Sequence, residues 1–240
     1  MSTRPTWWIG GLGRFVRPAE SAGKPMPPGL KRFLETRQPA PAGERCEMCN
    51  EAIPEEHPHV VNMESRALMC TCRPCYLLFT QRGAAGGKFA SVPDRYLHDP
   101  DFALTNAQWE DLQIPVKMAF FFVNSQLGRT VTFYPSPAGA TESLLPLDTW
   151  EQVMAANPLL ANLEPDVEAL IIYKQADRYE CFLVPIDACY ELVGHVRLHW
   201  RGFDGGQEAW ESIDGFFGQL RDKARPVSPR SGVSPNGNQA

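Results

Sequence analysis

The chain has 240 residues, of which 43% are apolar and 10% aromatic, which is enough for a buried core and excludes a globally disordered protein. The formal net charge of −5 is unevenly spread, because residues 1–43 carry a net +5 and residues 44–221 a net −12. An acidic body repels phosphate backbones, which argues against nucleic acid as a partner.

Residues 1–43 form a basic arm rich in proline and glycine. These residues leave no helical or strand periodicity, so we expect the arm to be mostly irregular. Trp7-Trp8-Ile9 and Phe15 form a candidate docking segment for a partner protein. The alternative is a linker whose aromatic side chains lie against the chain's own body.

Four of the seven cysteines form two C-x2-C pairs, and the odd total argues against a disulfide scaffold. Each pair can hold two thiolates near one ion, and two pairs complete the tetrahedral shell that Zn²⁺ favours. The spacing therefore predicts one structural Zn²⁺ per chain, bound by Cys46, Cys49, Cys72 and Cys75. A closed four-thiolate shell leaves no coordination position for catalysis.

The residues around the two pairs predict a treble-clef-like module over residues 44–80. Asn50 follows the first pair and tolerates the left-handed backbone that such a turn needs. Residues 59–64 and 66–71 have the composition of a short hairpin, and Cys75 runs directly into a predicted helix. The amino end of a helix also stabilises thiolates.

Other ligand sets remain open at this point. Cys70 and Cys72 point to the same face of an extended segment, so Cys70 could replace Cys72 or lie beside the cluster. His57 or His59 could complete a Cys3His site, and iron is the alternative to zinc. Three arginines are expected near the thiolates as charge partners: Arg45, Arg66 and Arg73.

Beyond the module, residues 81–221 contain signals for alternating hairpins and helices. Thr105 and Gln108 form a capping-box pattern that opens a short helix. Residues 118–124 and 130–134 are apolar and rich in β-formers, with Gly128 between them, and predict a hairpin.

Residues 134–142 (YPSPAGATE) are dense in turn residues and predict a loop leaving that hairpin. Asp148 and Glu151 form a second capping-box pattern, which opens the next helix. Residues 167–173 and 179–184 predict a further hairpin.

Two helices are predicted at the end of the body. Asp187 is the expected N-cap of the first, in which apolar residues recur at helical spacing from Cys189 to Trp200. Gly205-Gly206 separates it from an amphipathic helix that carries Trp210 to Leu220 on one face. Cys181 and Cys189 lie among apolar residues and are expected in the core, and residues 222–240 are expected to be a disordered tail.

No catalytic motif accompanies these elements: the sequence contains no phosphate-binding glycine loop, no HExxH and no GxSxG. The longest apolar run, Met118–Val123, is too short to span a bilayer, and the first residues lack a signal-peptide pattern. We therefore expect a cytoplasmic, non-enzymatic protein without a membrane span.

Several long stretches resemble a known family: HVVNMESRALMCTCRPCYLLF, VPDRYL, LQIPVKMAFFF, FYPSPAGATES, PDVEALIIY and HWRGFDGG. With the cysteine pairs, they are similar to a bacterial family of unknown molecular function whose genes lie in nickel–iron hydrogenase clusters. The resemblance covers residues 44–221. It implies a hydrogenase subunit or maturation protein as partner, and it implies no catalytic residues.

Together these features predict an α+β protein in which a zinc module is fused to an antiparallel hairpin-plus-helix body, flanked by disordered termini. The leading hypothesis for its function is an accessory, assembly or partner-binding protein of a nickel–iron hydrogenase. A metal-handling or redox factor that uses the cysteine cluster is the alternative. A zinc-dependent nucleic-acid-binding regulator is the third hypothesis, and the acidic body disfavours it.

Overall fold

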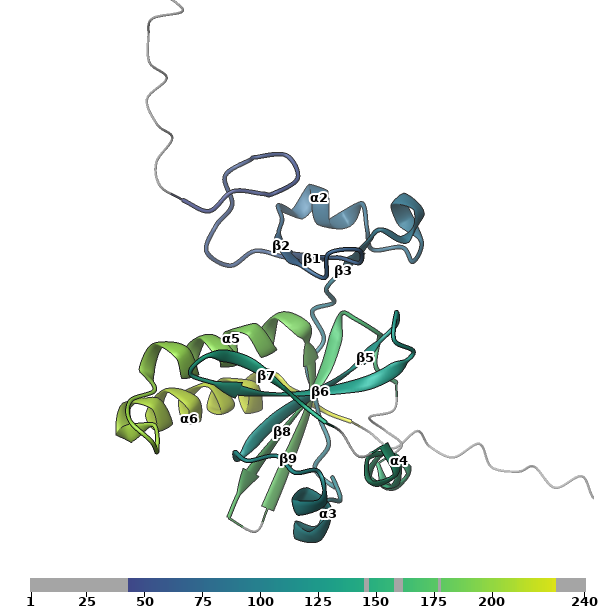
Figure 1. Ribbon diagram of the computed structural model, residues 1–240. Coiled ribbons are helices and arrows are strands. Elements are labelled where there is room, and N and C mark those ends of the chain that lie inside the picture. The colour runs from purple at the N-terminus through teal and green to yellow at the C-terminus, as the bar shows by residue number, and fades with distance from the viewer. Residues whose placement is uncertain (1–42, 145–146, 158–161, 177, 228–240) are drawn as a thin grey trace, which may run out of the picture. The chain divides into compact units, whose positions relative to one another are not determined.

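The computed structural model describes residues 43–144, 147–157, 162–176 and 178–227 (Figure 1). The docking segment at Trp7-Trp8-Ile9 and Phe15 and nearly all of the basic arm lie outside the described residues, as does most of the predicted tail. The described part combines antiparallel sheets with helices, which confirms the α+β class.

The first sheet has three strands in the order β2-β1-β3. Strands β1 (His59–Asn62) and β2 (Leu68–Cys70) form the predicted hairpin, with Arg66 in the left-handed region of its turn at φ 59°. Strand β3 (Phe89–Ser91) pairs with the other edge of β1 and follows the 3-10 helix η1 (Ala84–Gly87). The sheet therefore extends beyond residue 80, where the sequence placed the end of the module.

The second sheet has seven strands in the order β10-β4-β9-β8-β5-β6-β7. All neighbouring strands are antiparallel except β10 and β4, which are parallel. Both hairpins predicted for residues 118–134 and 167–184 are present as β5–β6 and β8–β9. The strands are β4 (Leu97–His98), β5 (Met118–Asn124), β6 (Arg129–Ser136), β7 (Gly139–Ser143), β8 (Glu168–Gln175), β9 (Arg178–Pro185) and β10 (Arg225–Pro226).

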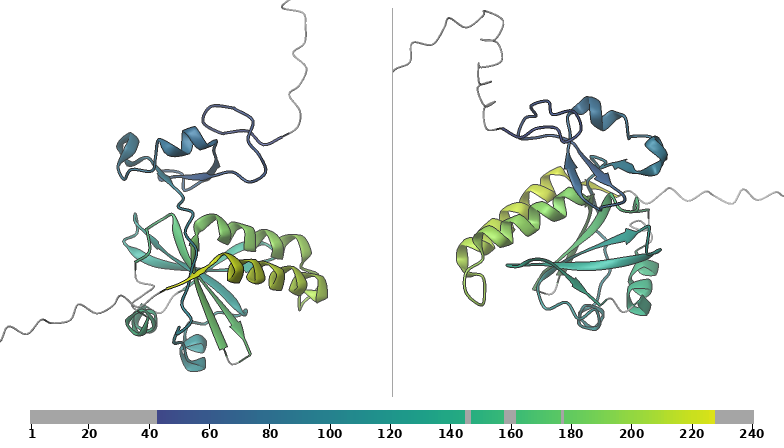
Figure 2. Two further views of the ribbon diagram at one scale, coloured as in Figure 1. Left: turned by 180° about the vertical axis from the view of Figure 1, so that it is seen from behind. Right: turned by 45° about the horizontal axis from the view of Figure 1, so that its top comes forward.

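Helices cover both faces of this sheet. Helices α5 (Ile186–His199) and α6 (Gly206–Lys223) lie side by side on one face, and α3 (Asn106–Asp111) and α4 (Leu147–Ala156) lie on the other (Figures 1 and 2). The short helix α2 (Arg73–Leu77) belongs to the cysteine module. Within the described residues, no helix combines the length and the hydrophobicity needed to cross a membrane.

The central strands supply two apolar cores because successive side chains of a strand point to opposite faces. In β8, Ile171 and Tyr173 lie in the core beneath α5 and α6, whereas Leu170 and Ile172 lie in the core beneath α3 and α4. In the second core, the ring of Phe121 stacks on Trp150 with centroids 4.1 Å apart. Because helices cover both faces of the sheet, both sets of side chains in these strands are buried, and their sequences are continuous apolar runs. Cys181 and Cys189 are buried in these cores, as predicted.

The segment predicted as an exit loop is instead a strand pair, so that prediction is wrong. Residues 134–136 complete β6, and β7 returns alongside them after a turn at residues 137–138. Pro135 is tolerated in β6 because it lies beyond the stretch of β6 that pairs with β5, so its missing N–H costs no ladder hydrogen bond on that side.

Two of the three predicted N-caps are also displaced. The capping box of Thr105 and Gln108 is present, with reciprocal hydrogen bonds of 3.2 and 3.0 Å. Helices α4 and α5, however, begin one residue before Asp148 and Asp187, so both carboxylates lie in the first helical turn. Their negative charge is stabilised there by the positive end of the helix dipole. Because Asp187 does not cap the helix, its side chain can contact another part of the chain.

The carboxyl end of the body extends further than predicted. Helix α6 continues to Lys223, beyond the boundary placed at residue 221, and the following strand β10 pairs with β4. A run of two residues carries no periodicity, so the sequence could not indicate β10.

Candidate metal centre

The first cysteine pair lies in a tight turn closed by a bridge between Arg45 and Ala52. The backbone N–H of Asn50 donates to the Cys46 carbonyl at 2.8 Å, and Asn50 takes the predicted left-handed conformation at φ 63°. The Arg45 guanidinium donates to the Asn50 carbonyl at 2.9 Å. These contacts fix the backbone of the turn that carries Cys46 and Cys49.

The second pair lies at the start of α2, as the sequence predicts. Cys72 is the N-cap and Cys75 lies in the first helical turn, with a proline between them at the start of the helix. Two hydrogen bonds connect this segment to the first turn: Glu47 N–H donates to the Cys70 carbonyl at 2.9 Å, and Cys70 N–H donates to the Glu47 carboxylate at 2.8 Å. The two cysteine turns are therefore attached to each other by backbone as well as by side chains.

The four sulfur atoms of Cys46, Cys49, Cys72 and Cys75 lie within 4.8 Å of one another, and all seven cysteines are free. The Sγ atoms of Cys49 and Cys72 are 3.6 Å apart. A tetrahedral ion with metal–sulfur bonds of about 2.3 Å places its ligand sulfurs roughly 3.8 Å apart. The four side chains thus fit one tetrahedrally bound metal ion.

The pKa values of Cys46 and Cys75 are shifted in opposite directions. Burial opposes ionisation of Cys46, but hydrogen bonds from the backbone N–H groups of Cys72, Cys49 and Met48 lower its pKa to about 6. Hydrogen bonding with Cys72 and burial raise the pKa of Cys75 to about 12. The Cys46 thiol therefore ionises readily whereas the Cys75 thiol keeps its proton, and a bound cation would favour the thiolate form of both.

The alternative ligands named from the sequence form a second group. His57, His59 and Cys70 each offer one ligand atom within 4.8 Å of the others, and none of them belongs to the four-cysteine set. Two of the three expected charge partners make other contacts: Arg66 donates to the side chains of Asn124 and Gln126, and the Arg73 guanidinium lies over the Tyr76 ring.

An apolar cavity of about 420 Å³ lies where the first sheet meets the second. Its walls include Val61 and Leu68 of the first sheet, Phe120 and Phe122 of β5, and Val193 of α5. Sequence reasoning missed this cavity, since its walls come from segments more than 100 residues apart. The available signal was the pair Val61 and Met63, which are two residues apart and therefore lie on one face of an extended segment.

Comparison with known proteins identifies the family. Residues 45–224 match the family described as "Family of unknown function (DUF5947)". No curated protein and no solved structure matches the chain. None of these findings connects the chain with hydrogenase genes, so that part of the resemblance stays a prediction. Because the match spans most of the sequence, including the cysteine module and the sheet body, the chain belongs to the DUF5947 family.

Proposed function

We propose that Cys46, Cys49, Cys72 and Cys75 bind one structural Zn²⁺. The ligand set is four thiolates, which zinc accepts in closed tetrahedral sites. A rubredoxin-type iron site would favour glycine after both pairs, and Asn50 and Tyr76 occupy those positions. The ion would stabilise a module that has few apolar contacts of its own.

We further propose that the protein is a non-enzymatic, cytoplasmic accessory or assembly protein that binds a partner protein. The observation that carries this proposal is the apolar cavity; the four-cysteine set supports it, because a closed shell of four thiolates would leave no coordination position for catalysis. Hydrophobic clefts with a polar rim are typical binding sites, and Arg66, Asn124 and Gln126 supply such a rim here. The sequence resemblance nominates a nickel–iron hydrogenase subunit or maturation protein as the partner.

The experiment is an affinity purification from cells that express the hydrogenase gene cluster. The tagged full chain is compared with Val193→Asp, which places a charge in the cavity, and with Leu198→Asp on the same helix. Leu198 is 68% exposed and lies outside the cavity, so it is the matched control. We expect a hydrogenase component to be recovered with the wild type and the control, and to be lost with Val193→Asp.

Two results would contradict this proposal. One is recovery of no hydrogenase component together with full hydrogenase activity after deletion of the gene. The other is equal recovery with both aspartate variants, which would remove the cavity from the interface. Circular dichroism of the two variants checks that Val193→Asp remains folded.

A second candidate function, a metal-handling or redox factor, is favoured by the exposure of Cys49. An exposed thiolate ligand offers an incoming chelator or partner thiol a point of attack. This candidate predicts rapid exchange of the bound ion with a chromogenic chelator, or a coloured centre. One slowly exchanging zinc per chain without visible absorption would exclude it.

A further inference from the structure

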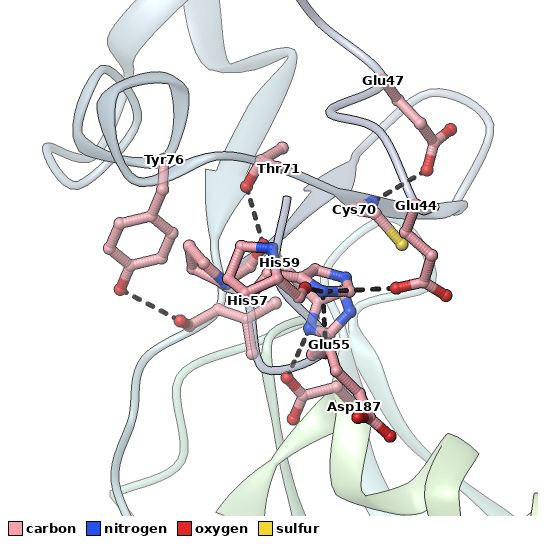
Figure 3. Close-up of polar contacts among 12 residues, drawn as sticks. Glu44, Glu47, Glu55, His57, His59, Cys70, Thr71, Tyr76 and Asp187 are labelled. Atoms are coloured by element: carbon pink, nitrogen blue, oxygen red, sulfur yellow. Dashed lines mark hydrogen bonds and ion pairs between the residues drawn. The ribbon is translucent and has the colours of Figure 1, made fainter. Parts of the chain in front are cut away.

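The group formed by His57, His59 and Cys70 has the arrangement of a metal site of its own (Figure 3). His59 of β1 and Cys70 of β2 are direct partners in the antiparallel register, so their side chains lie on the same face of the hairpin. His57 precedes His59 by two residues, and the two imidazole centroids are 4.8 Å apart. The hairpin therefore gathers three metal-ligating side chains without any contribution from the four-cysteine set.

His57 has one nitrogen atom without a partner. Its Nδ1 lies 2.9 Å from the Pro54 carbonyl oxygen and 3.0 Å from that of Glu55. A carbonyl oxygen only accepts, so Nδ1 carries the proton and Nε2 of the neutral ring keeps its lone pair. The side chain is 6% exposed, and Nε2 is buried with no hydrogen-bond partner among the described residues. Buried polar atoms in proteins nearly always have a partner, and a cation bound by this lone pair would supply one.

His59 is oriented in the way that metal-binding histidines usually are. Its Nδ1 lies 2.9 Å from Oδ2 of Asp187 in the first turn of α5, 128 residues away in the chain. The carboxylate accepts the Nδ1 proton, which again leaves Nε2 as the ligand atom. A carboxylate behind a ligating histidine fixes the ring and raises its basicity.

Cys70 completes the set with a sulfur ligand. Its backbone N–H is held by the Glu47 carboxylate, and the Glu44 carboxylate lies 3.4 Å from His57 Nδ1. Two imidazoles and one thiolate suit first-row divalent ions such as Zn²⁺ and Co²⁺. One thiolate neutralises only half the charge of such an ion, and the Asp187 carboxylate that accepts from His59 is enough to balance the remaining positive charge.

We propose that Nε2 of His57, Nε2 of His59 and Sγ of Cys70 bind a second divalent transition-metal ion, with Asp187 as the residue that positions His59. Three protein ligands leave the fourth tetrahedral position for water or another exchangeable ligand. A cavity of about 630 Å³ lies beside the two imidazoles, and its lining includes both histidines, Asp187 and Tyr96. This site is independent of the proposed function, because it shares no residue with the four-cysteine cluster or with the wall of the apolar cavity.

Metal stoichiometry of the reduced full-length chain tests the proposal. We expect two Zn²⁺ per chain for the wild type after dialysis against a slight excess of Zn²⁺, and one for Cys70→Ala and for His59→Ala. His199→Ala, which removes a histidine of α5 outside both groups, is the control and retains two. A wild type that holds one ion, or a Cys70→Ala variant that still holds two, would overturn the second site.

Two further measurements keep the test decisive if a ligand variant fails to fold. Co²⁺ added to a chain whose first site is already filled with Zn²⁺ should give a tetrahedral spectrum with the charge-transfer band of about one thiolate. The Asp187→Asn variant should still bind two ions, but its affinity for the ion at the second site should fall by about 10–100-fold. An octahedral cobalt spectrum would overturn the site, and unchanged affinity in Asp187→Asn would overturn the positioning role.

Discussion

The cysteine module and the sheet body reach stability in different ways. In residues 43–92 the buried apolar side chains are few: Cys46, Ile53, Val60, Val61, Tyr76 and Val92. The body has two cores, one on each face of its sheet, with fully buried Phe121, Phe182 and Phe217 among many aliphatic residues. A chain segment of about 50 residues cannot usually fold on so little apolar burial and needs a metal or disulfides.

From this comparison we expect the module to depend on a bound metal ion and on its contacts with the body, whereas the body depends on hydrophobic packing. Val61 of β1 lies in the core beneath α5 and α6. Arg66 donates hydrogen bonds to Asn124, the last residue of β5, and to Gln126 in the turn that follows. These contacts attach the module without giving it a core. We therefore expect metal removal to unfold one region and leave the other intact.

The largest effect is expected from loss of the four-thiolate site. Cys49→Ser combined with Cys75→Ser removes two ligands, and structural Zn²⁺ sites contribute on the order of 10–16 kcal/mol of apparent binding free energy at neutral pH. Hydrogen exchange should then show loss of protection in residues 59–70. Residues 168–185 serve as the internal reference and should stay protected. A module that keeps its protection without metal would contradict the comparison.

A large effect confined to the body is expected from Phe121→Ala. The ring is fully buried and stacks on Trp150, so the substitution should lower the free energy of unfolding by about 3–5 kcal/mol. Urea denaturation measures this, and metal content should not change. Phe203→Ala is the matched control, since Phe203 is fully exposed and should cost almost nothing. Equal effects of the two variants would argue against the second core.

An intermediate effect is expected from Arg95→Ala. The Glu168 carboxylate is buried and accepts hydrogen bonds from the Arg95 guanidinium and from Glu164 N–H. Removing Arg95 leaves a buried charge with one partner fewer, which should cost about 2–3 kcal/mol. Arg82→Ala breaks an exposed ion pair with Glu164 and should cost less than about 1 kcal/mol in the same thermal unfolding assay. A reversed order would show that burial does not decide the strength of these pairs.

The smallest effect is expected from Thr105→Ala, which removes one half of the capping box of α3. Loss of an N-cap side chain typically costs about 1 kcal/mol. The two-state free energy of unfolding, measured by tryptophan fluorescence because Trp109 lies in this helix, should fall by that amount. A change below about 0.3 kcal/mol would mean that packing of Trp109 alone holds the helix in place.

Local signals in the sequence were sufficient where the structure depends on neighbouring residues. The cysteine turns, the β1–β2 hairpin, the two hairpins of the second sheet and the capping box at Thr105 each follow from residues within about 25 positions of one another. The register of the β1–β2 hairpin places His59 opposite Cys70, and this pairing brings two residues of the proposed second metal site together.

The sequence by itself determined the α+β class, the grouping of four cysteines and the apolar strands, because turn chemistry, ligand spacing and side-chain periodicity are local properties. Only the tertiary structure decided that β3 joins the edge of β1, that β10 pairs with β4, and that Asp187 lies behind His59. These contacts join segments tens to more than a hundred residues apart, and many alternative partners satisfy the same local pattern. Packing of the whole chain selects among them.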